Sequence, residues 1–192
     1  MAWDTERTRR LLLEAAVEEF AEHGPEGARV DRVAARAGVN KERIYQYFGG
    51  KRQLFTAVLE AELAKVAAAV PLTADEIADL GEYAGRVFDY HCEHPHFLRL
   101  LAWEGLQGGP AAAEGERAAH YADKLAAFAD ARKKGAITGD IEPAHLLYAV
   151  HALATWWFTM PQVAHMMLAG APDDSPASRR AGLVRMVRRL TS

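Results

Sequence analysis

A short polar and basic stretch, residues 41–47, carries the side chains best suited to chemistry in this 192-residue sequence. Arg43 and Gln46 can reach the base edges that are exposed in the major groove of DNA. Tyr45 and Tyr47 have hydroxyls that can bond phosphate and rings that can contact the methyl group of thymine. These residue types indicate a surface that recognises double-stranded DNA.

Positive charge is concentrated around this stretch. Residues 28–54 contain seven Lys or Arg and two acidic residues, a local net charge of +5. The whole chain has a formal net charge of −3, so a negative polymer is attracted to this region and not to the protein as a whole. Lys51 follows a Gly-Gly pair at the expected start of a helix, where phosphate binds well. The residues expected to contact DNA are Arg29, Asn40, Lys41, Arg43, Tyr45, Gln46, Tyr47 and Lys51.

Two short helices joined by a tight turn are expected to position these side chains. Apolar residues recur at helical spacing along residues 30–37, and Gly38 follows where a left-handed residue commonly ends a helix. Asn40 is a suitable N-cap for a second helix, whose inner face carries Ile44 and Phe48. This pattern is typical of a helix-turn-helix that binds DNA. Spacing alone leaves open a small helical hairpin with a solvated basic face.

The N-terminal residues resemble the DNA-binding domain of the TetR family of transcriptional regulators. The family pattern runs from an Ala-Ala-x-x-x-Phe helix through an Ala-Gly-Val turn to a helix that ends in Tyr-x-Tyr-Phe and a following Lys-x-x-Leu. The matching residues are Leu12, Ala15, Ala16, Phe20, Gly24, Val33, Ala34, Ala37, Gly38, Val39, Ile44, Tyr45, Tyr47, Phe48, Lys51 and Leu54. The resemblance implies a DNA-binding helix-turn-helix and favours that interpretation over the hairpin.

Two positions depart from the family pattern. The family usually has Thr or Ser where Ala28 and Arg29 stand, so the usual hydroxyl–phosphate bond is missing, and Arg29 can replace it by a charge-assisted one. Glu42 stands where a small residue is common, which puts a negative charge near the groove. A glutamate can still accept a hydrogen bond from cytosine.

Composition and motifs narrow the class of protein. Half of the residues are hydrophobic, and 192 residues can bury a core in one or two small domains. The single cysteine excludes an internal disulfide and, with no apolar signal segment and no long apolar run, predicts a cytoplasmic protein outside the membrane. The sequence has no nucleophile elbow, no phosphate-binding Gly-rich loop and no His-Glu-x-x-His motif. We therefore expect neither an enzyme nor a cofactor.

Glycine, proline and capping residues divide the chain into helices. We expect an all-α protein of about nine or ten helices, with a break at Gly24 and one helix over residues 73–93. The expected domains are a three-helix DNA-binding domain, residues 1–50, and a helical ligand-binding and dimerisation domain, residues 51–192. A linking helix is expected to begin at residue 51.

The TetR resemblance implies that the C-terminal helices enclose a small-molecule pocket and that the last two long helices form a homodimer. Large side chains on candidate inner helices suit an apolar pocket with a few polar tips. The candidates are Phe88, His91, Cys92, Trp103, Tyr121, Phe128, Trp156 and Trp157. Plain core packing is the alternative for these residues.

A dimer also finds support in the residues themselves. Residues 143–158 and 175–190 carry more apolar surface than one core needs. A two-fold dimer would place its recognition helices in successive major grooves, about 34–36 Å apart or a multiple of this, so a palindromic operator is expected. A separate cluster offers four possible transition-metal ligands: His91, Cys92, His94 and His96. Its spacing matches no common zinc finger, and we expect no metal.

The leading hypothesis is a dimeric, sequence-specific transcriptional regulator, a repressor that a small-molecule effector releases from its operator. Effector binding would move the helix that begins at residue 51 and change the spacing of the two recognition helices. The alternative is a helical small-molecule or metal-binding protein without operator recognition, which Arg29 and Glu42 motivate.

Overall fold

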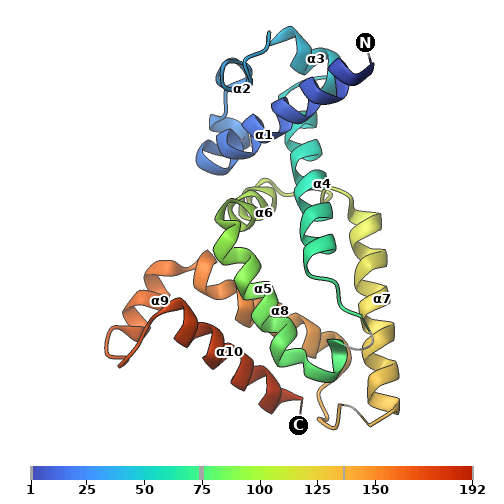
Figure 1. Ribbon diagram of the computed structural model, residues 1–192, viewed down its shortest axis with the longest axis vertical. Helices are drawn as coiled ribbons and strands as arrows, with labels where there is room; N and C mark the ends of the chain where they lie inside the picture. The colour runs from blue at the N-terminus through green and yellow to red at the C-terminus, as the bar shows by residue number, and fades with distance from the viewer. Residues whose placement is uncertain (1, 74–75, 136, 192) are drawn as a thin grey trace. The chain divides into compact units, whose positions relative to one another are not determined.

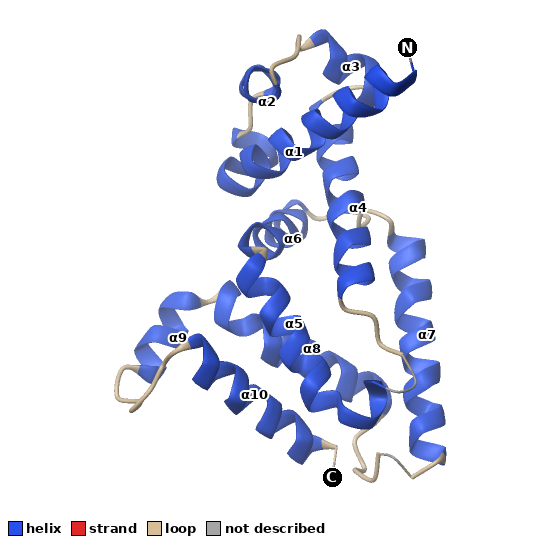
Figure 2. Cartoon of the chain, in the orientation of Figure 1, coloured by secondary structure: helices blue, strands red, loops and turns tan. Residues whose placement is uncertain are grey.

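The computed structural model describes residues 2–73, 76–135 and 137–191, and these residues form ten α-helices, one 3-10 helix and no strand (Figure 1, Figure 2). The α-helices are α1 (Ala2–Gly27), α2 (Val30–Ala37), α3 (Glu42–Phe48), α4 (Lys51–Ala69), α5 (Leu80–Glu93), α6 (Pro95–Gln107), α7 (Glu114–Lys133), α8 (Pro143–Thr159), α9 (Pro161–Leu168) and α10 (Pro176–Leu190). The 3-10 helix η1 (Glu76–Asp79) precedes α5. The expected all-α fold is confirmed. No helix in the described ranges is both long and apolar enough to cross a bilayer.

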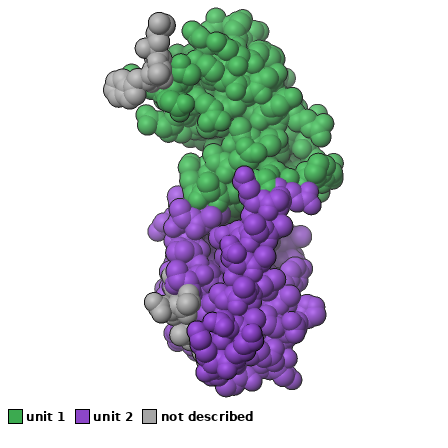
Figure 3. Space-filling view, turned by 90° about the vertical axis from the view of Figure 1, so that its right-hand side faces the viewer, with its two compact units in different colours: residues 1–65, 96–113 green, residues 66–95, 114–192 purple. Residues whose placement is uncertain are grey.

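The chain divides into two compact units, each discontinuous in sequence. The first unit contains residues 1–65 and 96–113, and the second contains residues 66–95 and 114–192 (Figure 3). Much of α4 and nearly all of α6 thus belong to the same compact unit as the N-terminal helices. The expected functional boundary after residue 50 remains a prediction.

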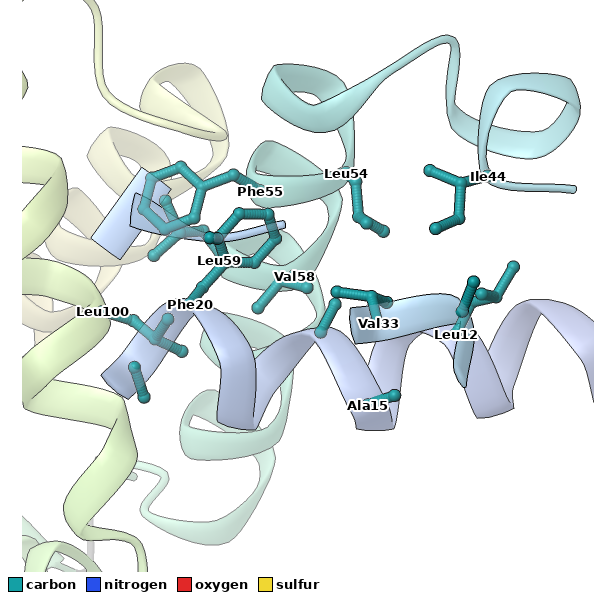
Figure 4. Packing of buried hydrophobic residues seen from close by; sticks show 14 residues of the cluster. Leu12, Ala15, Phe20, Val33, Ile44, Leu54, Phe55, Val58, Leu59 and Leu100 are labelled. Carbon is teal, nitrogen blue, oxygen red and sulfur yellow. The ribbon is translucent and has the colours of Figure 1, made fainter. Parts of the chain in front are cut away.

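An apolar core holds the helices of the first unit together. Its buried members include Leu12, Ala15, Phe20, Val33, Ile44, Leu54, Phe55, Val58, Leu59 and Leu100 (Figure 4). The rings of Phe20 in α1 and Phe55 in α4 meet edge to face, with centroids 5.1 Å apart. Ile44 is 0% exposed. Because Ile44 is the buried residue of the short helix α3, core packing fixes the inner face of that helix.

α1 bends at Gly24, where the sequence predicts a break. Gly24 has φ 66° and ψ 171°, a backbone conformation that residues with a Cβ rarely adopt. A Cβ at this position would lie 2.8 Å from the indole ring of Trp103 in α6. Glycine therefore permits both the bend and the close approach of α6 to α1.

α5 packs closely against α10 in the second unit (Figure 1). A Cβ at Gly81 of α5 would lie 2.7 Å from the carbonyl oxygen of Val184, and one at Gly85 would lie 2.8 Å from the guanidinium of Arg180. Arg180 Nε lies 2.7 Å from a carboxylate oxygen of Asp89, so an ion pair joins the two helices beside the glycines. Small residues and charge pairing together bring α5 and α10 into contact.

The segment expected to be one helix over residues 73–93 is interrupted in the part that the structure describes, residues 76–93, whereas residues 74 and 75 lie outside the described residues. η1 ends at Asp79, and α5 begins at the next residue. The Asp79 carboxylate accepts a hydrogen bond from the backbone N–H of Glu82 at 3.1 Å and so caps a new helix. It also accepts a hydrogen bond at 3.0 Å from Nε of Arg188 in α10. The interruption arises because Asp79 stabilises a helix start, an effect that apolar periodicity does not reveal.

Candidate nucleic-acid interface

The turn between α2 and α3 has the geometry that the sequence predicts. Gly38 follows α2 with φ 66° and ψ 30°, the left-handed conformation, and its N–H is directed at carbonyls of the last helical turn. Oδ1 of Asn40 accepts a hydrogen bond from the N–H of Glu42 at 3.3 Å, which satisfies a free donor at the start of α3. These two residues set the direction in which α3 leaves the turn.

The outer face of α3 presents side chains that can bind a nucleic acid. Arg43, Tyr45 and Gln46 are exposed, whereas Tyr47 is half-buried against the core of the first unit. Nη1 of Arg43 donates a hydrogen bond to Oε1 of Gln46 at 2.8 Å, so the two side chains lie together one turn apart. The amide N–H groups of Gln46 and the remaining guanidinium N–H groups can still meet base edges.

Lys41, a predicted DNA contact, and Arg36 of α2, which was not among the predicted contacts, each form an ion pair on the protein surface. Nζ of Lys41 lies 3.1 Å from Oδ1 of Asp31, and this hydrogen bond raises the pKa of Lys41. Nη1 of Arg36 lies 2.6 Å from Oε2 of Glu18. Both pairs are solvent-exposed and therefore weak, so phosphate can compete for the two cations. The side chain of Arg29, the residue that precedes α2, is exposed to solvent.

Lys51 has a structural role that its position in the sequence does not reveal. Its Nζ donates hydrogen bonds to the backbone oxygens of Glu26 at 3.1 Å and Ala28 at 3.3 Å. These contacts tie the start of α4 to the connection between α1 and α2. An ammonium has three N–H donors, so the predicted phosphate contact has to share this group with the two carbonyls.

Glu19 of α1 is a positioning residue that the sequence analysis missed. It is 1% exposed and accepts hydrogen bonds from the backbone N–H of Arg29 and from Nε of Arg32, both at 2.8 Å. Burial alone would raise the pKa of Glu19, but these hydrogen bonds outweigh it and the pKa is lowered. Glu19 thus caps α2, whose own N-cap residue makes no side-chain cap. Its place three residues after Ala16 of the apolar stripe is the signal that could have identified it.

The predicted ligand-binding residues are divided between the two units, and a shared site stays a prediction. Trp103 belongs to the first unit, where it packs against α1, and the other seven belong to the second. Phe88 and His91 of α5 share a neighbour in Phe158, with ring centroids 5.2 and 5.7 Å from it. Phe128 is 1% exposed and belongs to the core.

The remaining candidates lie nearer the surface. Cys92 is exposed, and Trp156 is 48% exposed. Trp157 is half-buried, and the guanidinium of Arg179 lies 5.6 Å from its ring centroid. Tyr121 is 44% exposed on α7, and its ring lies 6.1 Å from the His151 ring. His151 is also close enough to His91 for the two imidazoles to interact electrostatically, so it links Tyr121 to the group around Phe158.

The four possible metal ligands have different surroundings. Nε2 of His96 lies 2.8 Å from Oε2 of the buried Glu62 in the first unit. Burial and the charge of His94 lower the pKa of His91 to about 4, so His91 is neutral at pH 7. Among the described residues, no group of three His, Cys, Asp or Glu side chains is placed to hold a metal ion.

Two family descriptions match most of the chain. Residues 12–58 match the bacterial regulatory proteins of the tetR family, and residues 79–189 match the tetracyclin repressor-like C-terminal domain. The first match contains the helix-turn-helix described above. The second contains α5 to α9 and all of α10 except its last residue.

Individual proteins also resemble the chain, and two of the three named here do so along nearly its whole length. The HTH-type transcriptional repressor SCO4008 of Streptomyces coelicolor is 41% identical over 191 residues, which cover 98% of this chain and 97% of that protein. The HTH-type transcriptional repressor NicS of Pseudomonas putida is 37% identical over 112 residues, 56% of this chain and 53% of its own length. The crystal structure of SCO4942 from Streptomyces coelicolor, a proposed transcriptional regulator, superposes with a TM-score of 0.85 at 37% identity and covers 95% of this chain and 97% of its own.

Proposed function

Because this chain belongs to the TetR family of bacterial regulatory proteins, we propose that it is a sequence-specific DNA-binding transcriptional repressor that a small-molecule effector releases from a palindromic operator. The observation that carries the proposal is the arrangement of α3, in which Ile44 is buried and Arg43 and Gln46 point together into solvent. The relative SCO4008 is named a transcriptional repressor, which supports the proposal. The proposal assigns the protein to the cytoplasm and gives it no catalytic role.

DNA binding by this surface would proceed by exchange of partners. Phosphate would replace Asp31 at Lys41 and Glu18 at Arg36, and base edges would replace the contact between Arg43 and Gln46. The first two exchanges carry no sequence information, and the third does. Glu19 would hold α2, and thereby the turn, while these exchanges occur.

Dimerisation would use the solvent-exposed faces of α8 and α10. Tyr148 and Trp156 of α8 are 77% and 48% exposed and lie two turns apart on one face. Met186 of α10 is 42% exposed. Apolar side chains of this size on neighbouring helices support a protein partner, and a second copy gives the two-fold symmetry that a palindrome needs.

Release by an effector would act through α4. Residues 51–65 of this helix belong to the first unit and its last residues belong to the second, so the helix is continuous across the division in sequence. A coupling free energy of about 1–3 kcal/mol would weaken operator binding by about 5- to 150-fold.

Selection of bound fragments from the host genome tests the proposal. The regulator should enrich a palindrome, whereas a small-molecule or metal-binding protein without operator recognition should enrich none. In a gel-shift titration on the selected site, Arg43→Ala should cost about 1–3 kcal/mol of binding free energy and relax the preference at one base pair in each half-site. Arg99→Ala, which removes an exposed arginine from α6, is the matched control and should bind like the wild type. Equal losses for both variants would contradict the assignment of α3.

A further inference from the structure

A buried cation lies in the second unit, on the side of α7 that faces α5 and α8. Lys124 of α7 is only 7% exposed. Its Nζ donates a hydrogen bond to the hydroxyl of Tyr83 in α5 at 3.0 Å and lies 5.4 Å from the centroid of the Tyr83 ring. The same Nζ lies 5.9 Å from the centroid of the Tyr121 ring. The ammonium therefore lies near two tyrosine rings (Figure 1 shows the three helices).

The hydrogen bonds around Lys124 have a defined direction. The Tyr83 hydroxyl lies 3.3 Å from Nε2 of His151 in α8. Burial, together with the charge of Lys124, lowers the pKa of His151 to about 4, so the imidazole is neutral at pH 7. Lys124 can then donate to the Tyr83 oxygen while the Tyr83 hydroxyl donates to the imidazole nitrogen. This series of hydrogen bonds uses one of the three N–H donors of the ammonium.

No carboxylate of the described residues lies within ion-pair distance of Lys124. Buried charges in proteins are normally paired, because a charge removed from water without a counter-ion is costly. The two tyrosine rings attract the cation through their negative faces, but they accept neither of the other two N–H groups strongly. Burial lowers the pKa of Lys124, as expected for an ammonium that lacks a counter-ion.

The outer edge of this cluster reaches solvent. Tyr121 is 44% exposed, and its ring meets the His151 ring edge-on, with centroids 6.1 Å apart. His120, its neighbour on α7, is partly exposed as well. A ligand that displaced or moved Tyr121 would reach Lys124 between apolar ring faces.

We propose that Lys124, Tyr83, Tyr121 and His151 bind the carboxylate of a small organic acid with an apolar body, and that such an acid is the effector of this regulator. The carboxylate would accept hydrogen bonds from the two remaining N–H groups of Lys124 and supply the missing counter-charge. The aromatic rings would contact the apolar body. The role of the acid as an effector rests on the proposed function, but the binding of the acid to this site does not depend on DNA.

The first experiment compares acids with their own amides on the full-length wild type. Benzoate, phenylacetate and octanoate are titrated by calorimetry against benzamide, phenylacetamide and octanamide, which have the same bodies without the charge. At least one acid should bind about tenfold or more tightly than its amide, the ratio expected for a charge-assisted pair. The inference is overturned if no acid binds more tightly than its amide.

The second experiment locates the site. Lys124→Met keeps the length of the side chain and removes the charge, and it should abolish the preference for the acid. Lys133→Met removes an exposed cation from the same helix and should leave the preference unchanged. If Lys124→Met does not fold, as judged by circular dichroism, Lys124→Gln takes its place. An acid preference that survives the loss of this charge would refute the site.

The operator separates this inference from the proposed function. Lys124→Met should bind a selected operator as the wild type does, and the acid should release only the wild type. Acid binding without any enriched operator would refute the proposed regulator and support the acid-binding site. Operator binding without an acid preference would refute the acid-binding site and support the proposed regulator.

Discussion

Replacing Glu19 should destabilise the packing of α1 against α2 far more than replacing its neighbour Glu18. Both glutamates lie on α1 and pair with an arginine of α2, but Glu19 is buried and Glu18 is exposed. Glu19→Ala removes two charge-assisted hydrogen bonds, each worth about 1.5–3 kcal/mol when well desolvated. The Arg32 side chain is 42% exposed, and solvent screening therefore reduces its share.

The expected loss for Glu19→Ala is about 2–4 kcal/mol, because the N–H of Arg29 is also left without its acceptor. Glu18→Ala breaks one exposed pair and should cost less than about 1 kcal/mol. In a chain of this length, 1 kcal/mol lowers the melting temperature by roughly 2–4 °C, so the two variants should differ by several degrees.

Thermal unfolding of the full-length variants, followed by circular dichroism, measures this difference. Glu19→Gln keeps the shape of the side chain and should give an intermediate loss, since the amide oxygen can still accept one hydrogen bond. Operator affinity should fall with Glu19→Ala at a temperature where the protein is still folded, because α2 supports the turn before α3. Equal melting temperatures for the Glu18 and Glu19 variants would refute the claim that burial makes Glu19 the support of α2.

Four further substitutions have defined outcomes. Gly81→Ala should lower the free energy of unfolding in urea by about 1–3 kcal/mol, since its Cβ would lie 2.7 Å from a backbone oxygen of α10. Gly105→Ala in α6 meets nothing within 4 Å and should raise it by about 0.5–1 kcal/mol; a loss of equal size at both would contradict this packing. Burial would raise the pKa of Glu62, but hydrogen bonds from its lysine and histidine partners lower it below the ordinary value of 4.5. Glu62 therefore stabilises the fold fully above pH 4.5 and progressively less as the pH falls through its folded pKa, so Glu62→Gln should flatten stability measured across this acidic range. Tyr148→Glu should convert the proposed dimer to monomers in analytical ultracentrifugation, and a sedimentation coefficient equal to that of a dimeric wild type would exclude this face of α8 as the interface.

Local sequence carries much of the helix-turn-helix. The left-handed conformation after α2 is one that glycine adopts readily, and Gly38 occupies it. Asn40 caps the next helix, and Ile44 is the buried residue of α3, as their spacing predicts. Each of these effects acts within a few residues, so the sequence alone reveals it. The family resemblance then favoured a DNA-binding surface over a solvated hairpin.

Contacts between distant residues could not be predicted in the same way. Lys51 bonds carbonyls that lie 25 and 23 residues earlier in the chain, and the Lys124 ammonium meets a tyrosine 41 residues away. Neither partner is marked by a motif. The eight large residues predicted to share a pocket were chosen by size. Whether they share one stays a prediction, because size does not distinguish core, surface and site in helices that are apolar on several sides.

The place of α6 in the first unit has a consequence for synthesis. Leu100 and Trp103 complete a core whose other walls are made by the first 59 residues of the chain. A ribosome must therefore translate more than forty further residues, and release them from its exit tunnel, before this core can close. A truncated product that stops within α4 would lack Leu100 and Trp103 and would leave Gly24 without the indole that covers it, so α3 gains its full support only late in translation.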